Sequence, residues 1–215
     1  MHSVIVRNLW KRFNGNPILR GLNASFEEGS LTVITGPNGS GKTTLIRIVA
    51  GLTPPSEGFI SVYGFKPGSY KARRLTSVIL DKPLLYEELT VEENLELFKT
   101  LSGSEGGKFY EVALETLGVA RVWRRRVGEL SHGWRRRVDF ARSLIAEPKL
   151  LLVDEITTAF DNESLREVVS ILDSLTRSGS TVIATTPNPG DVELLADPVK
   201  RVCSLRDGVL ECEAM

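Results

Sequence analysis

Cysteine is scarce in this chain of 215 residues, which contains only Cys203 and Cys212. Two cysteines are too few for a disulfide framework or for a cysteine-ligated metal cluster. The first ten residues, MHSVIVRNLW, also lack the basic and then apolar pattern of a secretory signal. Together these absences predict a cytoplasmic protein whose thiols are reduced.

The chain also lacks a surplus of charge and a long hydrophobic run. Lys and Arg together number 27, as do Asp and Glu, so no net charge draws the molecule toward nucleic acid or lipid. The apolar runs, such as LLLV at 150–153, have the length of a core strand and are too short for a bilayer span. We therefore expect no nucleic-acid partner, no direct lipid binding and no membrane-spanning segment.

What remains is the composition of an ordinary globular protein, with 41% hydrophobic and 25% charged residues and no internal repeat. The early segments SVIVRNL, NASFEE and GFISVYG alternate like antiparallel strands. The runs SLTVITG, KLLLVDE and TVIATT are typical of buried parallel strands. Amphipathic helices lie between these runs, so we expect an α/β fold with a mostly parallel sheet.

The helical pattern is continuous over residues 84–146. TVEENLELFKTLSG opens with Thr90 and Glu93 in capping-box spacing and ends at a glycine. Its predicted buried face contains Val91, Leu95, Phe98 and Leu101, and that of the next helix Phe109, Val112, Ala113 and Leu117. We expect one domain over residues 1–215, in which a helical subdomain (84–146) is inserted into a nucleotide-binding core with an N-terminal β subdomain (1–83 and 147–215).

The stretch GPNGSGKTT predicts a phosphate-binding loop. It matches G-x-x-x-x-G-K-[ST] and stands between a predicted strand and a predicted helix, as that motif requires. Its successive backbone N–H groups and the helix N-terminus would surround phosphates, Lys42 would reach the β- and γ-phosphates, and the Thr43 hydroxyl would bind Mg²⁺. The residues expected to hold the nucleotide here are Gly36, Pro37, Asn38, Gly39, Ser40, Gly41, Lys42, Thr43 and Thr44.

Two acids, Asp154 and Glu155, end the strand KLLLVDE. Carboxylates at the tip of a buried strand are costly unless a cation or a reacting water uses them. In a phosphate-loop enzyme Asp154 would hold Mg²⁺ through water, and Glu155 would polarise the water that attacks the γ-phosphate. An acidic pair after a strand is usually a solvated turn, and the phosphate loop upstream favours the functional interpretation here.

Between these motifs lies ELSHGWRRRVDFARSL, in which Leu130, Ser131 and Gly133 resemble the signature motif of ABC-type ATPases. The similarity covers nearly the whole chain and is closest to cassettes of the drug-, antibiotic- and sodium-export type. It implies a P-loop NTPase core in which two cassettes meet head to tail and sandwich ATP and Mg²⁺. The Ser131 N-cap would then aim a helix dipole at the nucleotide of the partner cassette.

The resemblance also implies roles for other positions. Phe13 stands where the family places an aromatic ring that stacks on adenine, although a lone Phe after a strand is more often part of the core. Asp161 matches the aspartate of the D-loop, which communicates across the dimer. The segment VILDKPLLYEELTVEENL resembles the Q-loop, followed by the helical subdomain that faces a membrane partner.

Four positions depart from the family pattern. Asp81 replaces the Q-loop glutamine, and we expect it to accept a hydrogen bond from Mg²⁺-bound water. Trp134 replaces the signature glutamine, and Ile156 replaces the proline after the glutamate. Thr186 replaces the histidine that contacts the γ-phosphate, and its loss is expected to cost about 3 kcal/mol, or roughly a hundredfold in rate.

Three functions stay open on these residues. The first is a transporter's ATPase subunit, held at the inner face of the membrane by a separate multi-span permease and paired with a second cassette. The second is a degenerate cassette that binds ATP with little hydrolysis, as the regulatory half of a heterodimer. The third is a soluble ABC ATPase outside transport, for which the arginine runs 124–126 and 135–137 are the only suggestion. We interpret these runs instead as solvated charges of helix faces and loops, because acids elsewhere in the chain balance them.

Overall fold

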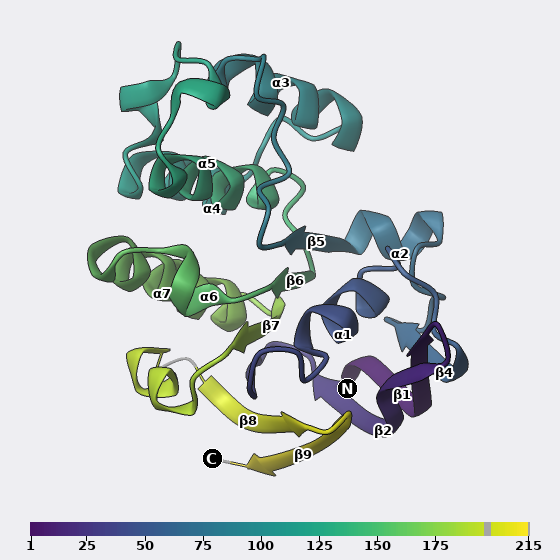
Figure 1. The fold of residues 1–215 in the computed structure, drawn as a ribbon. Helices are drawn as coiled ribbons and strands as arrows, with labels where there is room; N and C mark the ends of the chain where they lie inside the picture. The colour runs from purple at the N-terminus through teal and green to yellow at the C-terminus, as the bar shows by residue number, and fades with distance from the viewer. Residues whose placement is uncertain (196–198, 215) are drawn as a thin grey trace.

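The computed structural model describes residues 1–195 and 199–214, and the strands of this part form two sheets (Figure 1). The smaller sheet is antiparallel in the order β2-β1-β4, and the larger one has the order β5-β6-β7-β3-β8-β9. The strands are β1 (His2–Phe13), β2 (Asn16–Glu27), β3 (Leu31–Thr35), β4 (Glu57–Val62), β5 (Thr76–Ile79), β6 (Leu150–Val153), β7 (Thr181–Thr186), β8 (Val199–Arg206) and β9 (Val209–Ala214).

The larger sheet is parallel from β5 to β8 and closes with an antiparallel hairpin. The hairpin turns at Asp207 and Gly208, which both have positive φ, as a type I′ turn requires. Its register places Cys203 directly opposite Cys212, and a disulfide joins the two sulfur atoms. The prediction of reduced thiols is therefore wrong, because cross-strand pairing brings the cysteines together, and the cysteine count no longer supports a reducing compartment.

The central strands of the larger sheet, β3, β6 and β7, are buried on both faces. Because side chains alternate along a strand, Leu151 and Val153 of β6 pack into one hydrophobic core, and Leu150 and Leu152 pack into another. The first core includes the helices within residues 91–177, and the second includes the helix α1 (Lys42–Val49) and the smaller sheet. The continuous apolar runs that predicted parallel core strands are confirmed by this burial.

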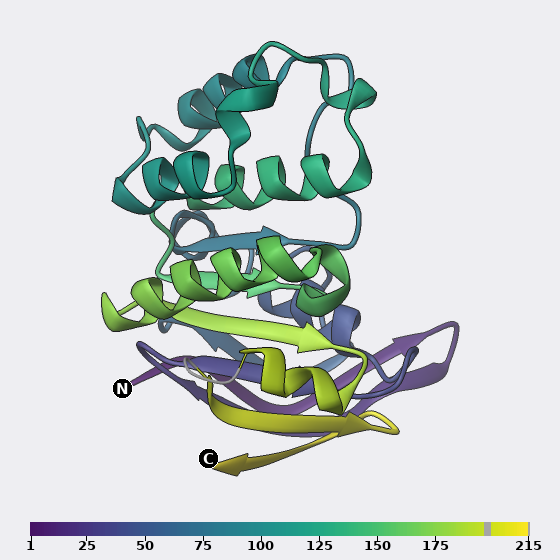
Figure 2. The same cartoon turned by 90° about the vertical axis from the view of Figure 1, so that its left-hand side faces the viewer.

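The helices are α1 (Lys42–Val49), α2 (Tyr70–Leu75), α3 (Val91–Ser102), α4 (Lys108–Thr116), α5 (His132–Leu144), α6 (Ile156–Ala159) and α7 (Asn162–Arg177), with 3-10 turns η1 (Val119–Val122), η2 (Val127–Glu129) and η3 (Pro189–Leu195). Helices α3, α4 and α5 gather at one end of the molecule, beyond the strand β5 (Figures 1 and 2). In the described ranges no helix combines the length and the hydrophobicity that crossing a membrane requires.

The start of α3 follows its sequence signal, but its buried face is only partly as predicted. The Thr90–Glu93 capping box is present with both of its hydrogen bonds. Leu101, however, is 68% exposed, and Val112 of α4 is also exposed, so both were wrongly assigned to the core. Tyr110 is buried instead, because α4 turns a neighbouring part of its surface toward α5 and α7.

Candidate nucleotide site

The phosphate loop connects β3 to α1, as the motif predicts. Gly41 occupies the N-cap of α1 with φ 107°, a left-handed conformation that favours glycine. At Gly36 a Cβ atom would lie 2.2 Å from the carbonyl oxygen of Leu205 on the neighbouring strand β8. The loop can therefore keep this path only with glycines, which leave its backbone N–H groups close to any bound phosphate.

Lys42 lies inside this loop. Its side chain is almost fully buried, and Nζ donates hydrogen bonds to the carbonyl oxygens of Gly36 at 2.6 Å and Pro37 at 3.0 Å. Burial lowers the pKa of Lys42, and the negative charges of Glu155 and Asp154 partly oppose that effect. A buried ammonium beside two carboxylates and a turn of backbone amides is suited to binding a polyphosphate.

Asp154 is fully buried at the end of β6. Its Oδ1 accepts a hydrogen bond from Thr185 Oγ1 at 2.7 Å, while Oδ2 is buried without a hydrogen-bond partner. Ser40 Oγ in the phosphate loop is also buried and unpartnered. An unsatisfied buried oxygen costs about 1–3 kcal/mol, and the shell of a hydrated Mg²⁺ would supply the missing donors. The oxygen ligands of this site therefore fit Mg²⁺.

The described residues contain no group of three or more His, Cys, Asp or Glu side chains placed to hold a metal ion. A magnesium ion here would use few protein ligands and complete its shell with water and phosphate oxygens. That arrangement is usual for Mg²⁺ in nucleotide enzymes. Thr43, half-buried at the start of α1, would supply the hydroxyl ligand.

Glu155 follows Asp154 in an unusual backbone conformation. Its φ is 52°, in the left-handed region, where a residue with a Cβ atom is strained. Thr185 holds this conformation, because the Glu155 N–H donates to Thr185 Oγ1 at 2.8 Å. On its carboxylate, Oε2 accepts from the Thr158 hydroxyl at 3.2 Å. Thr185 thus orients both acids, a role that the sequence did not indicate.

Glu155 and the phosphate loop line one hollow of about 320 Å³. The same hollow is lined by Phe13, whose side chain is 48% exposed, as stacking on a base requires. The ammonium of Lys11 lies 4.7 Å from the centroid of the Phe13 ring. Phe13 is therefore placed beside the phosphate site and not in the core, while its contact with adenine stays a prediction.

Asp81 lines a different hollow. Its Oδ1 accepts a hydrogen bond from Arg136 Nη2 at 3.1 Å, and Arg136 also donates to the carbonyl oxygen of Leu80. The Arg136 side chain is only 2% exposed, although it comes from one of the arginine runs that we interpreted as solvated. In this structure Asp81 is thus engaged with helix α5, and its role at Mg²⁺ stays a prediction.

Two further predicted residues are helix caps. Ser131 accepts a hydrogen bond from the backbone N–H of Trp134 at the start of α5, which confirms it as the N-cap. Asp161 caps α7, and its bonds from the Ser164 backbone and hydroxyl, followed by that from Arg137, lower the pKa of the carboxyl group. A Cβ placed on Gly133 would have no atom within 4 Å outside its own helix turn, so the surface at the start of α5 is open at this residue.

Thr186 ends β7 with its side chain fully buried. Its hydroxyl lies 2.8 Å from that of Thr157 and 3.2 Å from Asp191 Oδ2. Asp191 belongs to η3, and the sequence analysis gave it no role. Thr186 is therefore part of an internal polar cluster, and its expected contact with the γ-phosphate stays a prediction.

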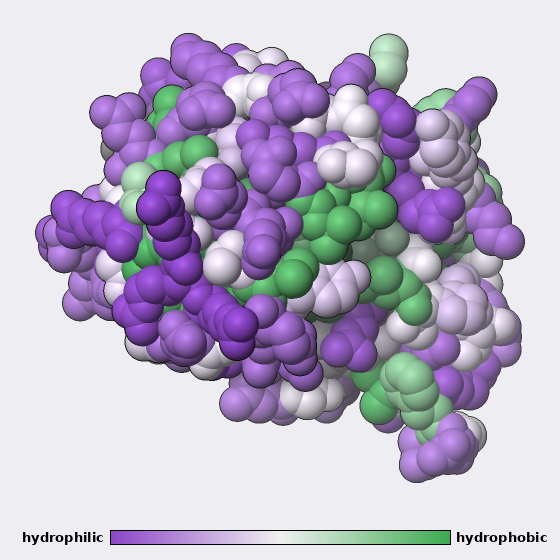
Figure 3. All heavy atoms as spheres, turned by 90° about the horizontal axis from the view of Figure 1, so that it is seen from above, coloured by the Kyte–Doolittle hydropathy of each residue, from purple (hydrophilic) through white to green (hydrophobic). Residues whose placement is uncertain are grey.

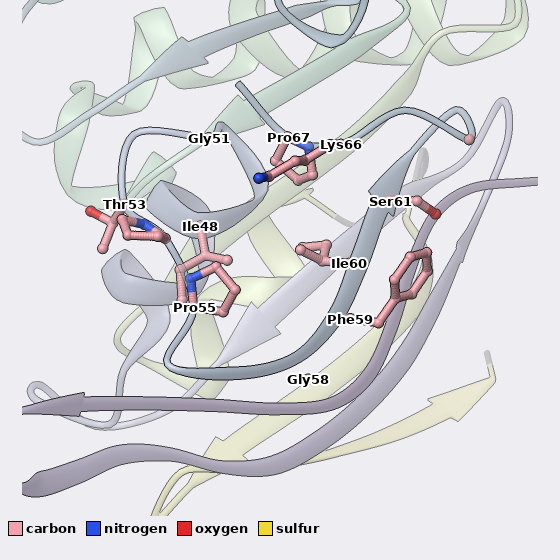
Figure 4. A pocket seen from close by; sticks show the side chains of 12 residues that line it. Ile48, Gly51, Thr53, Pro55, Gly58, Phe59, Ile60, Ser61, Lys66 and Pro67 are labelled. Carbon is pink, nitrogen blue, oxygen red and sulfur yellow. The ribbon is translucent and has the colours of Figure 1, made fainter. Parts of the chain in front are cut away.

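A separate cavity of about 360 Å³ lies between α1, β4 and the turn that carries Lys66 and Pro67 (Figure 4). Its walls are mostly apolar, with Ile48, Ile60 and Phe59 among them. It includes neither an acid nor any part of the phosphate loop, so its lining offers none of the chemistry described above.

Comparison with known proteins points to one family. Residues 19–158 match the family model described as "ABC transporter". The chain is 37% identical over 203 residues to Nod factor export ATP-binding protein I of Rhizobium sp. (strain N33), covering 92% of this chain and 66% of that protein. It is 31% identical to the lantibiotic transport ATP-binding protein SrtF of Streptococcus pyogenes, covering 89% of this chain and 83% of that protein.

Solved structures show the same fold. An ATP-binding subunit of an ABC transporter superimposes with a TM-score of 0.89 at 24% identity, over 99% of this chain and 90% of the other. A dimeric ATP-binding cassette in a post-hydrolysis state, bound to ADP and Pi, gives a TM-score of 0.83 at 28% identity, over 98% of each chain. The prediction of a phosphate-loop α/β fold with an antiparallel β layer and added helices is confirmed.

We predict that Lys42→Met weakens MgATP binding by roughly a hundredfold, because a charge-assisted bond to a phosphate contributes about 2–3 kcal/mol. Isothermal titration calorimetry measures the change. Lys66→Met is the matched control, since Lys66 is exposed beside the separate cavity and should leave the affinity unchanged. Equal affinities of wild type and Lys42→Met would contradict the placement of phosphate in this loop.

Proposed function

Because the chain belongs to the ABC transporter family of ATP-binding proteins, we propose that it binds MgATP and hydrolyses it to drive a separate membrane permease. The observation that carries the proposal is the single hollow shared by Lys42, Thr43 and Glu155. The unpartnered oxygen of Asp154 supports it, because a magnesium shell would satisfy that oxygen. The chain spans about two thirds of the length of the Nod factor relative, so the activity of that whole protein is also only a proposal here.

The polar groups of the hollow and the neighbouring Asp154 have distinct parts in the proposed hydrolysis. The loop amides and Lys42 bind and neutralise the phosphates. Thr43 and Asp154 would hold a magnesium ion, which would neutralise part of the negative charge of the phosphates. Glu155, fixed at the backbone by Thr185, accepts a hydrogen bond from the attacking water and draws off its proton. Because its φ is left-handed, Glu155 precedes helix α6 and is not part of it, and its side chain lines the hollow.

We propose that the active form is a pair of cassettes. Neither Ser131 nor Gly133 lines the hollow of the phosphate loop, so the free N–H groups of α5 have no phosphate within their own chain to bind. The open space at Gly133 would admit the nucleotide of a second cassette to this helix end. The dimeric ADP-bound structure among the similar folds supports such pairing.

We propose a surface for the permease at the junction between the nucleotide-binding core and the helical subdomain. We assign residues 84–146 to the helical subdomain. A hollow of about 610 Å³ lies there, lined by Asp81, Leu85, Tyr86 and the acids Glu87 and Glu88. Tyr86 is 52% exposed. Figure 3 views the molecule from the helical end and shows apolar side chains gathered in the middle of this face, with hydrophilic ones around them. Such a patch is typical of a protein-binding surface.

An exporter is the type of transporter that we propose. Two relatives are named for Nod factor export and daunorubicin resistance, and a third for lantibiotic transport. The chain would then sit at the cytoplasmic face of the cell membrane, bound there through the permease.

A regulatory cassette that binds ATP with little turnover is the second candidate. It is favoured by two of the altered positions, because Asp81 is paired with Arg136 and Thr186 is buried in an internal cluster. A partner cassette would then supply the active site. The presence of Glu155 in the phosphate hollow favours hydrolysis by this chain.

We predict that Glu155→Gln lowers the rate of ATP hydrolysis by about a hundredfold or more, since general-base catalysis contributes about 10²–10⁴. MgATP affinity should be retained, because the glutamine keeps the shape of the side chain. Steady-state phosphate release measures the rate, and calorimetry measures the affinity. Indistinguishable rates for the two proteins would defeat the ATPase proposal and favour the regulatory cassette.

We further predict that Tyr86→Asp abolishes co-purification with a multi-span protein from detergent-solubilised membranes, because the change removes an exposed aromatic ring and adds a fourth carboxylate to a hollow already lined by Asp81, Glu87 and Glu88. MgATP binding should not change. Tyr70→Asp is the control, since Tyr70 is 67% exposed on α2, outside the lining of this hollow. Co-purification that survives Tyr86→Asp would show that the permease docks elsewhere.

A further inference from the structure

We propose that Asp191 is a positioning residue for hydrolysis, and that Thr186 acts through Asp191 instead of contacting the nucleotide. The proposal rests on the hydrolysis proposed above and adds a residue to it. It starts from the location of Thr186, which pairs across the sheet with Thr35, the residue before Gly36 of the phosphate loop. Thr186 is thus next to the site, yet its side chain is fully buried.

The hydroxyl groups of Thr157 and Thr186 share a limited number of protons. Their oxygens lie 2.8 Å apart, and Asp191 Oδ2 lies 2.8 Å from the Thr157 oxygen and 3.2 Å from the Thr186 oxygen. Each hydroxyl has one proton to donate, and an ionised carboxylate only accepts. The Thr186 hydroxyl also lies 3.5 Å from the carbonyl oxygen of Asn188. Two protons must therefore serve these four contacts, and every acceptor of the Thr186 proton belongs to this cluster.

The carboxylate is itself fixed in place. Asp191 Oδ1 accepts a hydrogen bond from the side-chain amide of Asn188 at 3.0 Å, and its backbone N–H donates to the Asn188 carbonyl oxygen. One acid therefore ties η3 to the end of β7 and to α6. Asp191 is only half-buried, so its carboxyl group keeps contact with solvent.

The contact with α6 connects the cluster to Glu155. Thr157 is two residues after Glu155, whose left-handed φ of 52° is a conformation that surrounding contacts must maintain. Thr185 holds the N–H of Glu155 on one side, at 2.8 Å. The Thr157–Asp191 bond holds the chain on the other side, so the strained residue is fixed from both directions.

A double-mutant cycle in the full chain tests this arrangement. We expect Asp191→Ala and Thr186→Val each to lower kcat by about tenfold, the rate equivalent of one lost hydrogen bond, with the KM for ATP unchanged. The double variant should be no slower than either single variant, because both changes remove the same connection. Thr186→Ser keeps the hydroxyl and should restore the wild-type rate.

Glu193→Ala is the matched control, since Glu193 is an exposed acid of the same η3 segment. Asp191→Asn, which keeps the size of the side chain, repeats the test if the alanine variant unfolds. Multiplied effects in the double variant would overturn the proposal and indicate a direct contact between Thr186 and the nucleotide. An unchanged kcat in both Asp191 variants would also overturn it. A wild-type rate equal to that of Glu155→Gln would instead overturn the proposed hydrolysis and this inference together.

Discussion

A carboxylate buried with one unsatisfied oxygen is the constraint on which the nucleotide site depends. Asp154 is fully buried because it directly follows the buried strand β6, and Thr185 donates a hydrogen bond to its Oδ1. The other oxygen still lacks a donor, and the nearby ammonium of Lys42 bonds to the carbonyl oxygens of the phosphate loop. Folding thus places an unsatisfied carboxylate oxygen and a buried ammonium close together, and the magnesium–triphosphate complex that we propose would supply an oppositely charged partner to each.

The end of β7 contacts the chain on both sides of Glu155, the proposed catalytic base. Successive strand residues point to opposite faces, so Thr185 and Thr186 reach different partners from adjacent positions. Thr185 supports Asp154 and the backbone of Glu155, while Thr186 joins the cluster of Thr157 and Asp191. The end of a strand in the parallel sheet therefore holds Glu155 in its strained conformation. Hydrogen bonds of the Thr185 and Thr186 hydroxyl groups offset the free-energy cost of that strain.

The parts of this molecule that sequence predicts are those encoded locally. The phosphate loop and the Ser131 cap depend on residues a few positions apart, and both are present as expected. The pairing of Asp81 with Arg136 and the disulfide depend on residues brought together by tertiary structure, which one sequence does not reveal. Leu101 follows the helical periodicity of α3 and is still exposed. Periodicity identifies the residues that share one face of a helix, but it does not show how far along that face the neighbouring elements reach.

The dependence of ATP binding on magnesium tests the central role of Asp154 most directly. Calorimetry would compare the ATP affinity of the wild type with Mg²⁺ and with EDTA, and then repeat both titrations with Asp154→Asn. We expect Mg²⁺ to strengthen wild-type binding by roughly tenfold or more, about 1.4 kcal/mol, and the variant to lose most of that gain. The same affinity with and without Mg²⁺ in the wild type would contradict the account.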